Sequence, residues 1–353
     1  MGQPAIVGRA RQALGRLSMT AAPWTLVAEE LVAQLRQVVG FDSFCVVQND
    51  PRARLPAAAV SDNHCLGLRQ RLLWQLEMRG PDVNKSALLA RAARPVGVLS
   101  NASGGDLARS ARWRELLAPA GIGDELRAAL VADGRWWGSV SLYRERRSPR
   151  FTAEDAEAVG GLIGPSAAVA RTAWTAGPDR AGVVPDAPGT LLVTADGQTV
   201  TATPSAYSWL ARLPSAQRVS GSLVQALTAH LAAAGDRNLA PRAVQSLVRG
   251  ADGSWIEFSA STLEPPVAAG DVAITVQQPL PSAITGLLLA AYMLTRRERE
   301  VTGLAMAGRS TAEIGAELFL SPHTVADYLK GIFAKTGVHS REELSRRLTG
   351  LSD

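Results

Sequence analysis

The carboxy-terminal segment from Leu294 onward carries closely spaced helix-start signals. Most are a Ser or Thr followed three residues later by Glu, so that the hydroxyl can accept from a first-turn amide while the carboxylate accepts from the cap residue. Ser321-Pro322 marks another start, because proline has no amide hydrogen to lose at a first helical position. The segment is therefore predicted to form four short helices. The paired starts are Thr295 with Glu298, Ser310 with Glu313, and Ser340 with Glu343, and glycines that suit helix ends follow at Gly308, Gly337 and Gly350.

Four short helices with a tight turn between the middle two have the layout of a helix-turn-helix, whose second helix enters the DNA major groove. The helix expected at 322–336 has an apolar stripe at helical spacing that should pack against the other helices. That stripe is formed by Val325, Leu329, Ile332 and Phe333. The other face carries His323, Ala326, Asp327 and Lys330. Two of the chain's three lysines, Lys330 and Lys335, fall in this helix; a solvated helix face often carries lysines, but together with the helix-start signals they favour a polyanionic partner.

This segment resembles the LuxR-type helix-turn-helix of bacterial transcriptional regulators. The family pattern runs Leu-Thr-x-Arg-Glu-x-Glu-Val, Gly, Glu-Ile, Ser-x-x-Thr-Val, Ile-Phe-x-Lys, Gly-Val and Ser-Arg-x-Glu-Leu. The matching residues are Leu294, Thr295, Arg297, Glu298, Glu300, Val301, Gly308, Glu313, Ile314, Ser321, Thr324, Val325, Ile332, Phe333, Lys335, Gly337, Val338, Ser340, Arg341, Glu343 and Leu344.

The resemblance implies an all-α DNA-binding domain with double-stranded DNA as its partner. It assigns DNA contacts to His323, Thr324, Val325, Ala326, Asp327, Lys330 and Lys335, and scaffold roles to Thr295, Glu298, Gly308, Ser310, Glu313, Ser321, Gly337, Ser340 and Arg341. Ala326 and Tyr328 stand where the family often has Lys and His, so the usual operator is in doubt. Ala326 offers only a methyl contact, Asp327 can accept from cytosine N4, and Lys330 can donate to guanine or phosphate.

The length of 353 residues suggests two or three domains. Pro/Gly-rich stretches at 175–189 and 277–282 divide the chain. We therefore predict a multidomain protein with domains at 19–174, 188–278 and 283–353.

The first domain is predicted to mix helices and strands. Its clearest signal is Asp133-Gly134 between two β-rich runs, which indicates a hairpin. We expect helices at 24–39, 66–77, 107–117 and 152–174, and strands at 44–48, 126–131 and 136–143. The order is similar to an α+β GAF-type sensor domain, and residues 94–144 carry that resemblance.

The second domain is predicted to be α+β and looks like a PAS domain. A hairpin around Asp196-Gly197 opens it, and Asp252-Gly253 introduces a later strand. The expected strands are 190–194, 199–202, 255–259 and 271–277, and the expected helices are 207–213 and 223–234.

Trp136 and Trp137 are the candidate ligand-pocket residues. Neighbouring strand residues face opposite sides, so one should be buried while the other is exposed or lines a cavity. A small-molecule effector would then act by favouring one arrangement of the DNA-binding domains. The alternative is a ligand-independent regulator whose front domains only dimerise or bind a protein partner.

Enzyme motifs are lacking: the sequence has no G-x-S-x-G, no H-E-x-x-H and no P-loop. Cys45 lies in an apolar strand-like run, Cys65 follows His64, and the four histidines are scattered, so we expect no metal site and no cofactor. The net charge of +5 is compatible with a polyanionic partner. We expect a cytoplasmic homodimer with no membrane association, and the resemblance admits RNA polymerase as a further partner.

Overall fold

The structure is a computed structural model that describes residues 3–62, 70–78, 80–177, 185–195, 197–214, 219–235, 243–264 and 271–350. It contains two compact units, residues 1–278 and 279–353. None of the described helices is both long enough and apolar enough to cross a membrane. The predicted Cys65 and the start of the helix expected at 66–77 lie outside the described residues.

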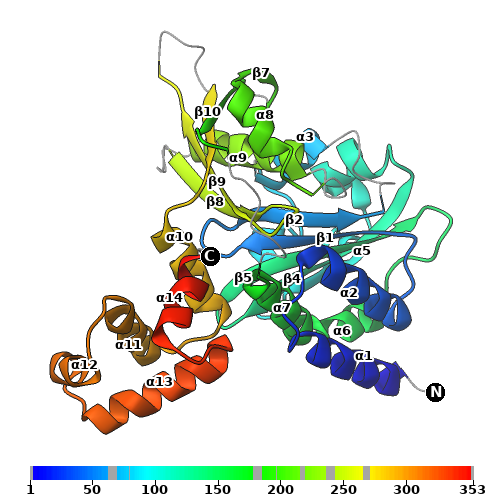
Figure 1. Ribbon diagram of the computed structural model, residues 1–353. Coiled ribbons are helices and arrows are strands. Elements are labelled where there is room, and N and C mark those ends of the chain that lie inside the picture. Colours follow the sequence, from blue (N-terminus) through cyan, green and yellow to red (C-terminus); the bar gives the residue numbers. More distant parts are fainter. Residues whose placement is uncertain are drawn as a thin grey trace. The chain divides into compact units, whose positions relative to one another are not determined.

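The amino-terminal unit contains two antiparallel five-stranded sheets (Figure 1). The first has the order β2-β1-β5-β4-β3. Its strands are β1 (Ser43–Asp50), β2 (Leu55–Ser61), β3 (Val96–Val98), β4 (Ile122–Ala132) and β5 (Arg135–Glu145). Asp133 and Gly134 both have positive φ, 52° and 69°, as the mirror-image hairpin turn requires. The predicted hairpin is confirmed.

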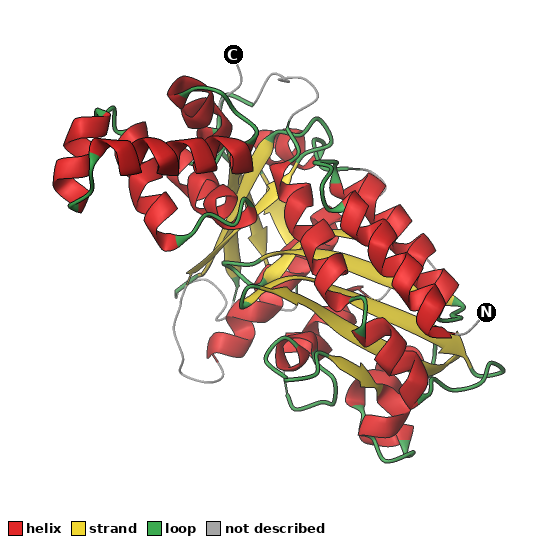
Figure 2. Ribbon diagram, turned by 90° about the horizontal axis from the view of Figure 1, so that it is seen from below, coloured by secondary structure: helices red, strands yellow, loops and turns green. Residues whose placement is uncertain are grey.

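Helices cover both faces of the first sheet. One face carries α1 (Gln3–Leu17), α2 (Trp24–Val38), α6 (Ala153–Gly160), α7 (Ile163–Thr172) and the 3-10 turn η3 (Ala173–Thr175). The opposite region carries α3 (Gln70–Met78), α4 (Ser86–Leu89), α5 (Leu99–Ala102), η1 (Leu107–Arg109) and η2 (Trp113–Leu117). Figure 2 shows helices lying along the strands. The apolar stripe of α2, which includes Leu31 and Leu35, is buried.

The second sheet repeats the strand order of the first. The order is β7-β6-β10-β9-β8, which places the first and last strands of the domain side by side, as in the first sheet. Its strands are β6 (Gly189–Val193), β7 (Thr199–Ala202), β8 (Ala243–Arg249), β9 (Trp255–Thr262) and β10 (Val272–Gln277), and its helices are α8 (Pro204–Leu210) and α9 (Val219–Gly235). The hairpin predicted near residue 196 pairs β6 with β7; Asp196 itself is not among the described residues.

Polar and aromatic contacts tie the two sheets together. The Asp50 carboxylate, which is fully buried, accepts from the Leu247 amide at 3.0 Å. The rings of Trp174 and Trp255 are stacked with centroids 5.8 Å apart, and the Arg249 guanidinium lies 3.6 Å from the Trp255 ring centroid. Arg249 also donates to the carbonyls of Trp174 and Ala176. The two front domains therefore share a packed joint.

Several predicted elements differ from the structure. The helix expected at 107–117 is a 3-10 turn and a π-helical turn separated at Ser110, whose hydroxyl donates to Asp82. The helix expected at 152–174 breaks after Gly160-Gly161 into α6 and α7. In the described part of the amino-terminal unit, six elements were not predicted: α1, β2, α4, β3, α5 and β8. β2 was missed because its sequence, LPAAAVS, contains three alanines and a proline, which are residue types depleted in strands.

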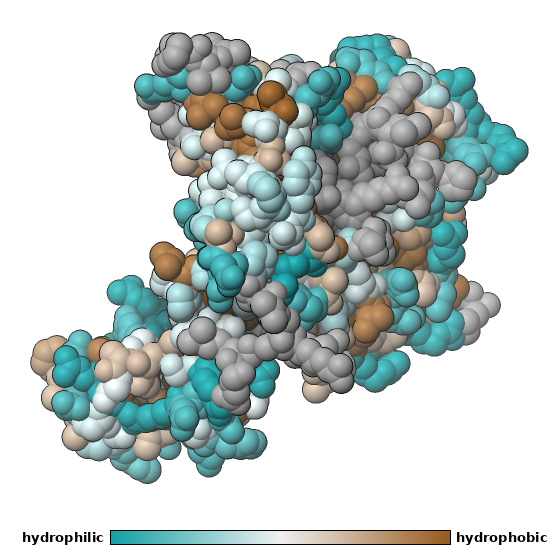
Figure 3. All heavy atoms as spheres, turned by 45° about the horizontal axis from the view of Figure 1, so that its top comes forward, coloured by the Kyte–Doolittle hydropathy of each residue, from teal (hydrophilic) through white to brown (hydrophobic). Residues whose placement is uncertain are grey.

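The carboxy-terminal unit is all helical, as predicted. It consists of α10 (Pro281–Ala291), α11 (Arg296–Met306), α12 (Thr311–Leu318), α13 (Pro322–Thr336) and α14 (Arg341–Thr349). α13 packs on α11 and α12, and α14 packs on α10 and α11. Figure 3 shows hydrophilic residues spread over the visible face of this unit.

Candidate DNA-binding surface

Side-chain caps fix where the helices of the carboxy-terminal unit begin. Thr295 Oγ1 accepts from the Glu298 amide at 3.3 Å, and Glu298 Oε2 accepts from the Thr295 amide at 2.7 Å. Ser310 and Glu313 form the same reciprocal pair at 3.2 and 2.7 Å. Each pair satisfies two amides that the helix leaves unbonded.

The third expected pair differs by one residue. Ser340 accepts from the Glu343 amide at 3.1 Å, but the Glu343 carboxylate accepts from the His339 amide at 2.6 Å instead of returning to Ser340. The helix start is the predicted one, and the carboxylate binds the residue before the cap.

The turn between α12 and α13 depends on close backbone contact. The Leu320 amide donates to the Gly315 carbonyl at 2.8 Å. A Cβ on Gly315 would lie 2.7 Å from the Leu320 carbonyl oxygen, so only glycine fits there without a shift. Phe319 ends α12 in the left-handed conformation with φ of 56°. Ser321 then caps α13 by accepting from the Thr324 amide at 3.0 Å.

The predicted division of α13 into two faces is present. Val325, Leu329 and Ile332 are buried, and Phe333 is half-buried. His323, Ala326, Asp327 and Lys330 are exposed, and Thr324 is half-buried at the first turn. The exposed residues recur at helical spacing from the amino-terminal end of α13, so they form one continuous strip.

Val325 corrects the expected set of DNA contacts. Its side chain has no exposed surface and packs in the core, so it cannot reach a base or a phosphate. Valine at this position holds the helix in the domain, and the residues on either side of it face outward.

Lys335 forms an ion pair within the domain. Its Nζ lies 2.8 and 2.7 Å from the two carboxylate oxygens of Glu298, so the ion pair joins the end of α13 to the start of α11. Burial alone would raise the pKa of Glu298, but hydrogen bonds from Lys335 and Thr295 lower it below its usual value. The ion pair gives Lys335 a structural role between α13 and α11.

The strip carries charges of both signs. His323 Nε2 lies 3.7 Å from Asp327 Oδ2, and these side chains are 89% and 67% exposed. One turn further along, Lys330 is exposed. An exposed pair of this kind contributes little to stability, so its residues are available for recognition.

Arginines brace the helices behind this strip. Arg297 donates to the Leu318 carbonyl at 2.8 Å and pairs with Glu300 at the same distance. Arg341 donates to the Arg309 carbonyl and to Thr311 Oγ1, which ties α14 to the start of α12. Arg341 was predicted from the resemblance, whereas nothing in the sequence identified the partners of Arg297.

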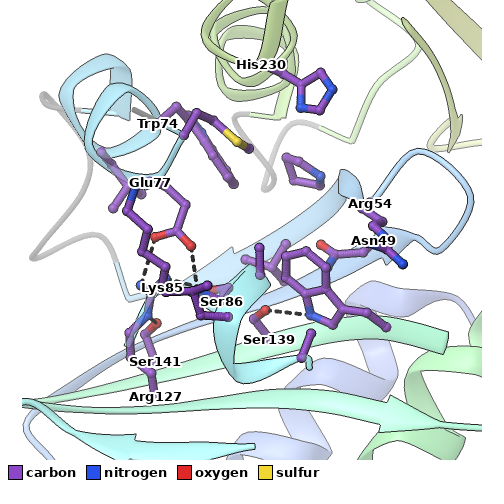
Figure 4. A pocket seen from close by; sticks show the side chains of 18 of the residues that line it. Asn49, Arg54, Trp74, Glu77, Lys85, Ser86, Arg127, Ser139, Ser141 and His230 are labelled. Carbon is purple, nitrogen blue, oxygen red and sulfur yellow. Dashed lines mark hydrogen bonds and ion pairs between the residues drawn. The ribbon is translucent and has the colours of Figure 1, made fainter. Parts of the chain in front are cut away.

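A second candidate site lies in the amino-terminal unit. A cavity of about 1220 Å³ is lined by the first sheet together with α3, α4 and α9 (Figure 4). Trp136 lines this cavity, whereas Trp137 is 1% exposed and points to the other side of the strand. The prediction that the two rings separate is confirmed, and Trp137 is removed from the candidate pocket. Among the described residues, no group of His, Cys, Asp and Glu could hold a metal ion.

Comparison with known proteins gives a family match for the carboxy-terminal helices and another for the first domain of the amino-terminal unit. The model of the "Bacterial regulatory proteins, luxR family" matches residues 292–348, and the GAF domain model matches residues 24–170. The spore germination protein GerE of Bacillus subtilis (strain 168) is 41% identical over 51 residues, which cover 14% of this chain and 69% of GerE. The chain belongs to the luxR family of bacterial regulatory proteins. Its front domain at 24–170 is a GAF domain, and its last four helices form the LuxR-type DNA-binding domain of a transcriptional regulator.

Other similarities are more partial. The monoamine regulon transcriptional regulator of Klebsiella aerogenes is 44% identical over 55 residues, which cover 16% of this chain and 24% of that regulator. A complex of Vibrio cholerae VqmA with ligand and DNA aligns at 18% identity and a TM-score of 0.23, covering 48% of this chain and 86% of VqmA. The bacteriophytochrome RpBphP3 of R. palustris aligns at 15% identity and a TM-score of 0.31, covering 76% and 61% of the two chains.

Proposed function

We propose that this LuxR-family regulator reads double-stranded DNA with the exposed strip of α13 in the major groove. The observation that carries the proposal is the exposed strip itself. It begins at the amino-terminal end of α13, which Ser321 caps, directly after the tight turn that follows α12. Major-groove base edges are read by short polar side chains at that end of such a helix. The contacts we assign are His323, Thr324, Ala326, Asp327 and Lys330.

Charge on this DNA-binding domain is nearly balanced. Residues 294–349 contain nine Lys/Arg and seven Asp/Glu, and several of the cations are paired inside the domain. Affinity should therefore fall only modestly with salt, since the slope follows the number of phosphates neutralised. Discrimination between sequences is expected to come from Asp327 and Lys330.

The front domains are proposed to sense a small molecule and to pair two chains. We propose functional domains at 19–174, 188–278 and 283–353, with α1 extending the first. The repeated strand order supports a PAS-like second domain, and the cavity supports sensing. Because the target is DNA, we propose a cytoplasmic location, with RNA polymerase as the partner of an activating form and no catalytic activity.

Selection from random duplex DNA with the full-length chain tests this function. We expect one enriched motif, arranged as an inverted repeat if two chains bind together, because a two-fold dimer places its readers about one helical turn apart, roughly 34 Å. The proposal is contradicted if the DNA pool remains random after selection, both without additions and in the presence of a small-molecule fraction of a cell extract.

Lys330→Ala should weaken binding to the selected duplex by about 1–3 kcal/mol if Lys330 donates to a guanine. Fluorescence anisotropy of a labelled duplex measures the change. Lys335→Ala is the matched control for DNA contact: it removes the Glu298 brace, so its effect should appear in the melting temperature. Unchanged affinity of Lys330→Ala removes that residue from the readout.

Asp327→Ala should relax sequence preference more than it changes affinity. The carboxylate can accept from cytosine N4 but repels phosphate, so its removal loses discrimination while easing the approach of DNA. Repeating the random-duplex selection with the variant measures this. If wild type and variant select identical sites, Asp327 does not read a base.

A further inference from the structure

The floor of the cavity is a regular grid of side chains from two neighbouring strands. Cys45 and Val47 of β1 stand directly opposite Ser141 and Ser139 of β5. Asn49 continues the β1 row, and all five residues line the cavity. The pairing of β4 with β5 slips by one residue at Trp137, which is why Trp136 joins this face.

Buried charges at one end of the cavity cancel one another. Arg127 Nη1 lies 2.8 Å from Glu77 Oε2, and Arg112 Nη2 lies 2.7 Å from Glu125 Oε2. Burial would raise the pKa of Glu77, but the charges of Arg127 and Arg112 lower it below its usual value. The cluster contains three carboxylates and three cations with no net charge: Glu77, Asp82, Glu125, Lys85, Arg112 and Arg127.

The guanidinium of Arg127 is fully engaged by the protein. It donates to Ser86 Oγ at 2.8 Å, to the Asn84 carbonyl at 3.2 Å and to Ser141 Oγ at 3.3 Å, in addition to Glu77. A carboxylate or phosphate placed here would therefore meet a balanced cluster and add an uncompensated buried charge, which is unfavourable. This end of the cavity therefore disfavours a carboxylate or phosphate group.

The opposite end offers hydrogen-bond donors. Asn49 is 2% exposed, and its Nδ2 is a buried donor with no partner among the described residues. Ser139 Oγ accepts from Trp136 Nε1 at 3.1 Å, so its own hydroxyl hydrogen can donate. In Figure 4, Asn49 and the charged group of Glu77, Lys85 and Arg127 lie at opposite ends. A buried amide without a partner is unusual and calls for an acceptor from outside the chain.

Apolar walls complete the cavity, and they come from both front domains. Leu73 and Trp74 of α3 and Trp136 of β5 supply flat or aliphatic surface. His230 and Ala233 of α9 supply a wall from the second domain, and Figure 4 shows His230 extending toward the cavity from that helix. Aromatic surface of this kind favours an aromatic ligand.

We propose that this cavity binds an uncharged aromatic molecule with a carbonyl-type acceptor that receives the Asn49 amide, and that α9 contacts the same molecule. The inference rests on the proposed sensing function and specifies its ligand class.

A matched pair of probes tests the ligand class. The full-length chain is titrated with 2-naphthamide and with 2-naphthoate, which share a ring system and differ in charge, and binding is followed by tryptophan fluorescence and calorimetry. We expect 2-naphthamide to bind at least about tenfold more tightly, a difference of about 1.4 kcal/mol. Equal or tighter binding of 2-naphthoate overturns the neutral class, and no binding of either probe overturns the site.

Asn49→Leu separates a ligand contact from a structural role. Leucine removes the unpartnered donor, so the variant should melt about 2–4 °C higher while losing its preference for 2-naphthamide over naphthalene. Asn101→Leu makes the same change at an exposed position of α5 and should leave that preference unchanged. A lower melting temperature, or an unchanged preference in Asn49→Leu, overturns the role of Asn49.

DNA selection by the same preparations distinguishes the two proposals. If the probes fail but the chain still enriches a motif, only the ligand inference falls. If the chain enriches no motif while 2-naphthamide binds, the cavity stands and the proposed DNA readout falls.

Discussion

Arg112→Ala should lower the free energy of unfolding of the amino-terminal unit by about 3–5 kcal/mol, because it removes the cation that donates to the buried Glu125 carboxylate. Arg112 is 1% exposed, and it donates twice to Glu125 Oε2, at 3.0 and 2.7 Å. It also donates to the Val83 carbonyl and lies 3.8 Å from Asp82. Glu125 is itself 1% exposed, so water cannot replace the lost hydrogen bonds, and its remaining cation is Arg127, whose Nε lies 3.7 Å from Glu125 Oε1.

Chemical denaturation followed by tryptophan fluorescence measures this loss. Arg147→Ala is the matched control, since Arg147 pairs with Glu145 at 2.9 Å but its side chain is 86% exposed. That surface pair should contribute less than about 1 kcal/mol. Adding Glu125→Ala to Arg112→Ala should restore part of the loss, because the buried carboxylate that lost its hydrogen bonds from Arg112 is removed. Equal effects of Arg112→Ala and Arg147→Ala contradict the account of the buried network.

Gly315→Ala should destabilise the DNA-binding domain by about 1–3 kcal/mol, although alanine usually favours a helix. Its Cβ would lie 2.7 Å from the Leu320 carbonyl oxygen, and a backbone atom in a tight turn cannot move aside cheaply. We expect the turn at Leu320 to shift to make room for the Cβ, and α13, which follows this turn, to move with it. DNA affinity should therefore fall by more than the loss of one base contact, which is about 1–3 kcal/mol.

Gly303→Ala is the matched control within the same domain. Gly303 is helical and exposed, and a Cβ added there would have no neighbouring atom within 4 Å. Alanine there should stabilise the domain by about 0.5–1 kcal/mol and leave DNA binding unchanged. Melting temperature and anisotropy on the selected duplex measure both variants. Changes of the same sign at Gly303 and Gly315 would show that the turn has room for a side chain.

Local signals predicted much of the fold. Thr295 and Ser310 cap their helices with reciprocal bonds, and Asp133-Gly134 forms the expected turn, because each depends on neighbours close in sequence. Elements stabilised by distant partners were missed or misjudged. β2 exists because it pairs with β1, and α6 ends early because Gly160-Gly161 weakens the helix there.

The two faces of α13 were predicted, and two residues of the expected DNA-contact set are buried or paired within the domain. Motif position alone placed Val325 and Lys335 among the DNA contacts. The burial of Val325 follows from helical periodicity, whereas the pairing of Lys335 with Glu298 joins residues far apart in sequence. Phe319 in the left-handed conformation was missed, since such positions usually carry glycine or asparagine.

Of the residues that line the cavity, only Trp136 was predicted from the sequence. Trp136 and Trp137 were correctly expected to face opposite sides of a strand, but the strand slip that turns Trp136 inward depends on the partner strand. The balance of charges around Arg127 and the unpartnered Asn49 amide come from elements spread over both front domains. No spacing in the sequence brings these groups together.

The central claim, that α13 reads bases in the major groove, is tested most directly by 7-deazapurine substitution of the selected duplex. Replacing each purine in turn removes one N7 acceptor from the major groove and leaves the minor groove unchanged. We predict that at least one substitution weakens binding of the wild-type chain and that Lys330→Ala no longer responds at a guanine so identified. Equal binding of every substituted duplex by the wild-type chain would contradict the account.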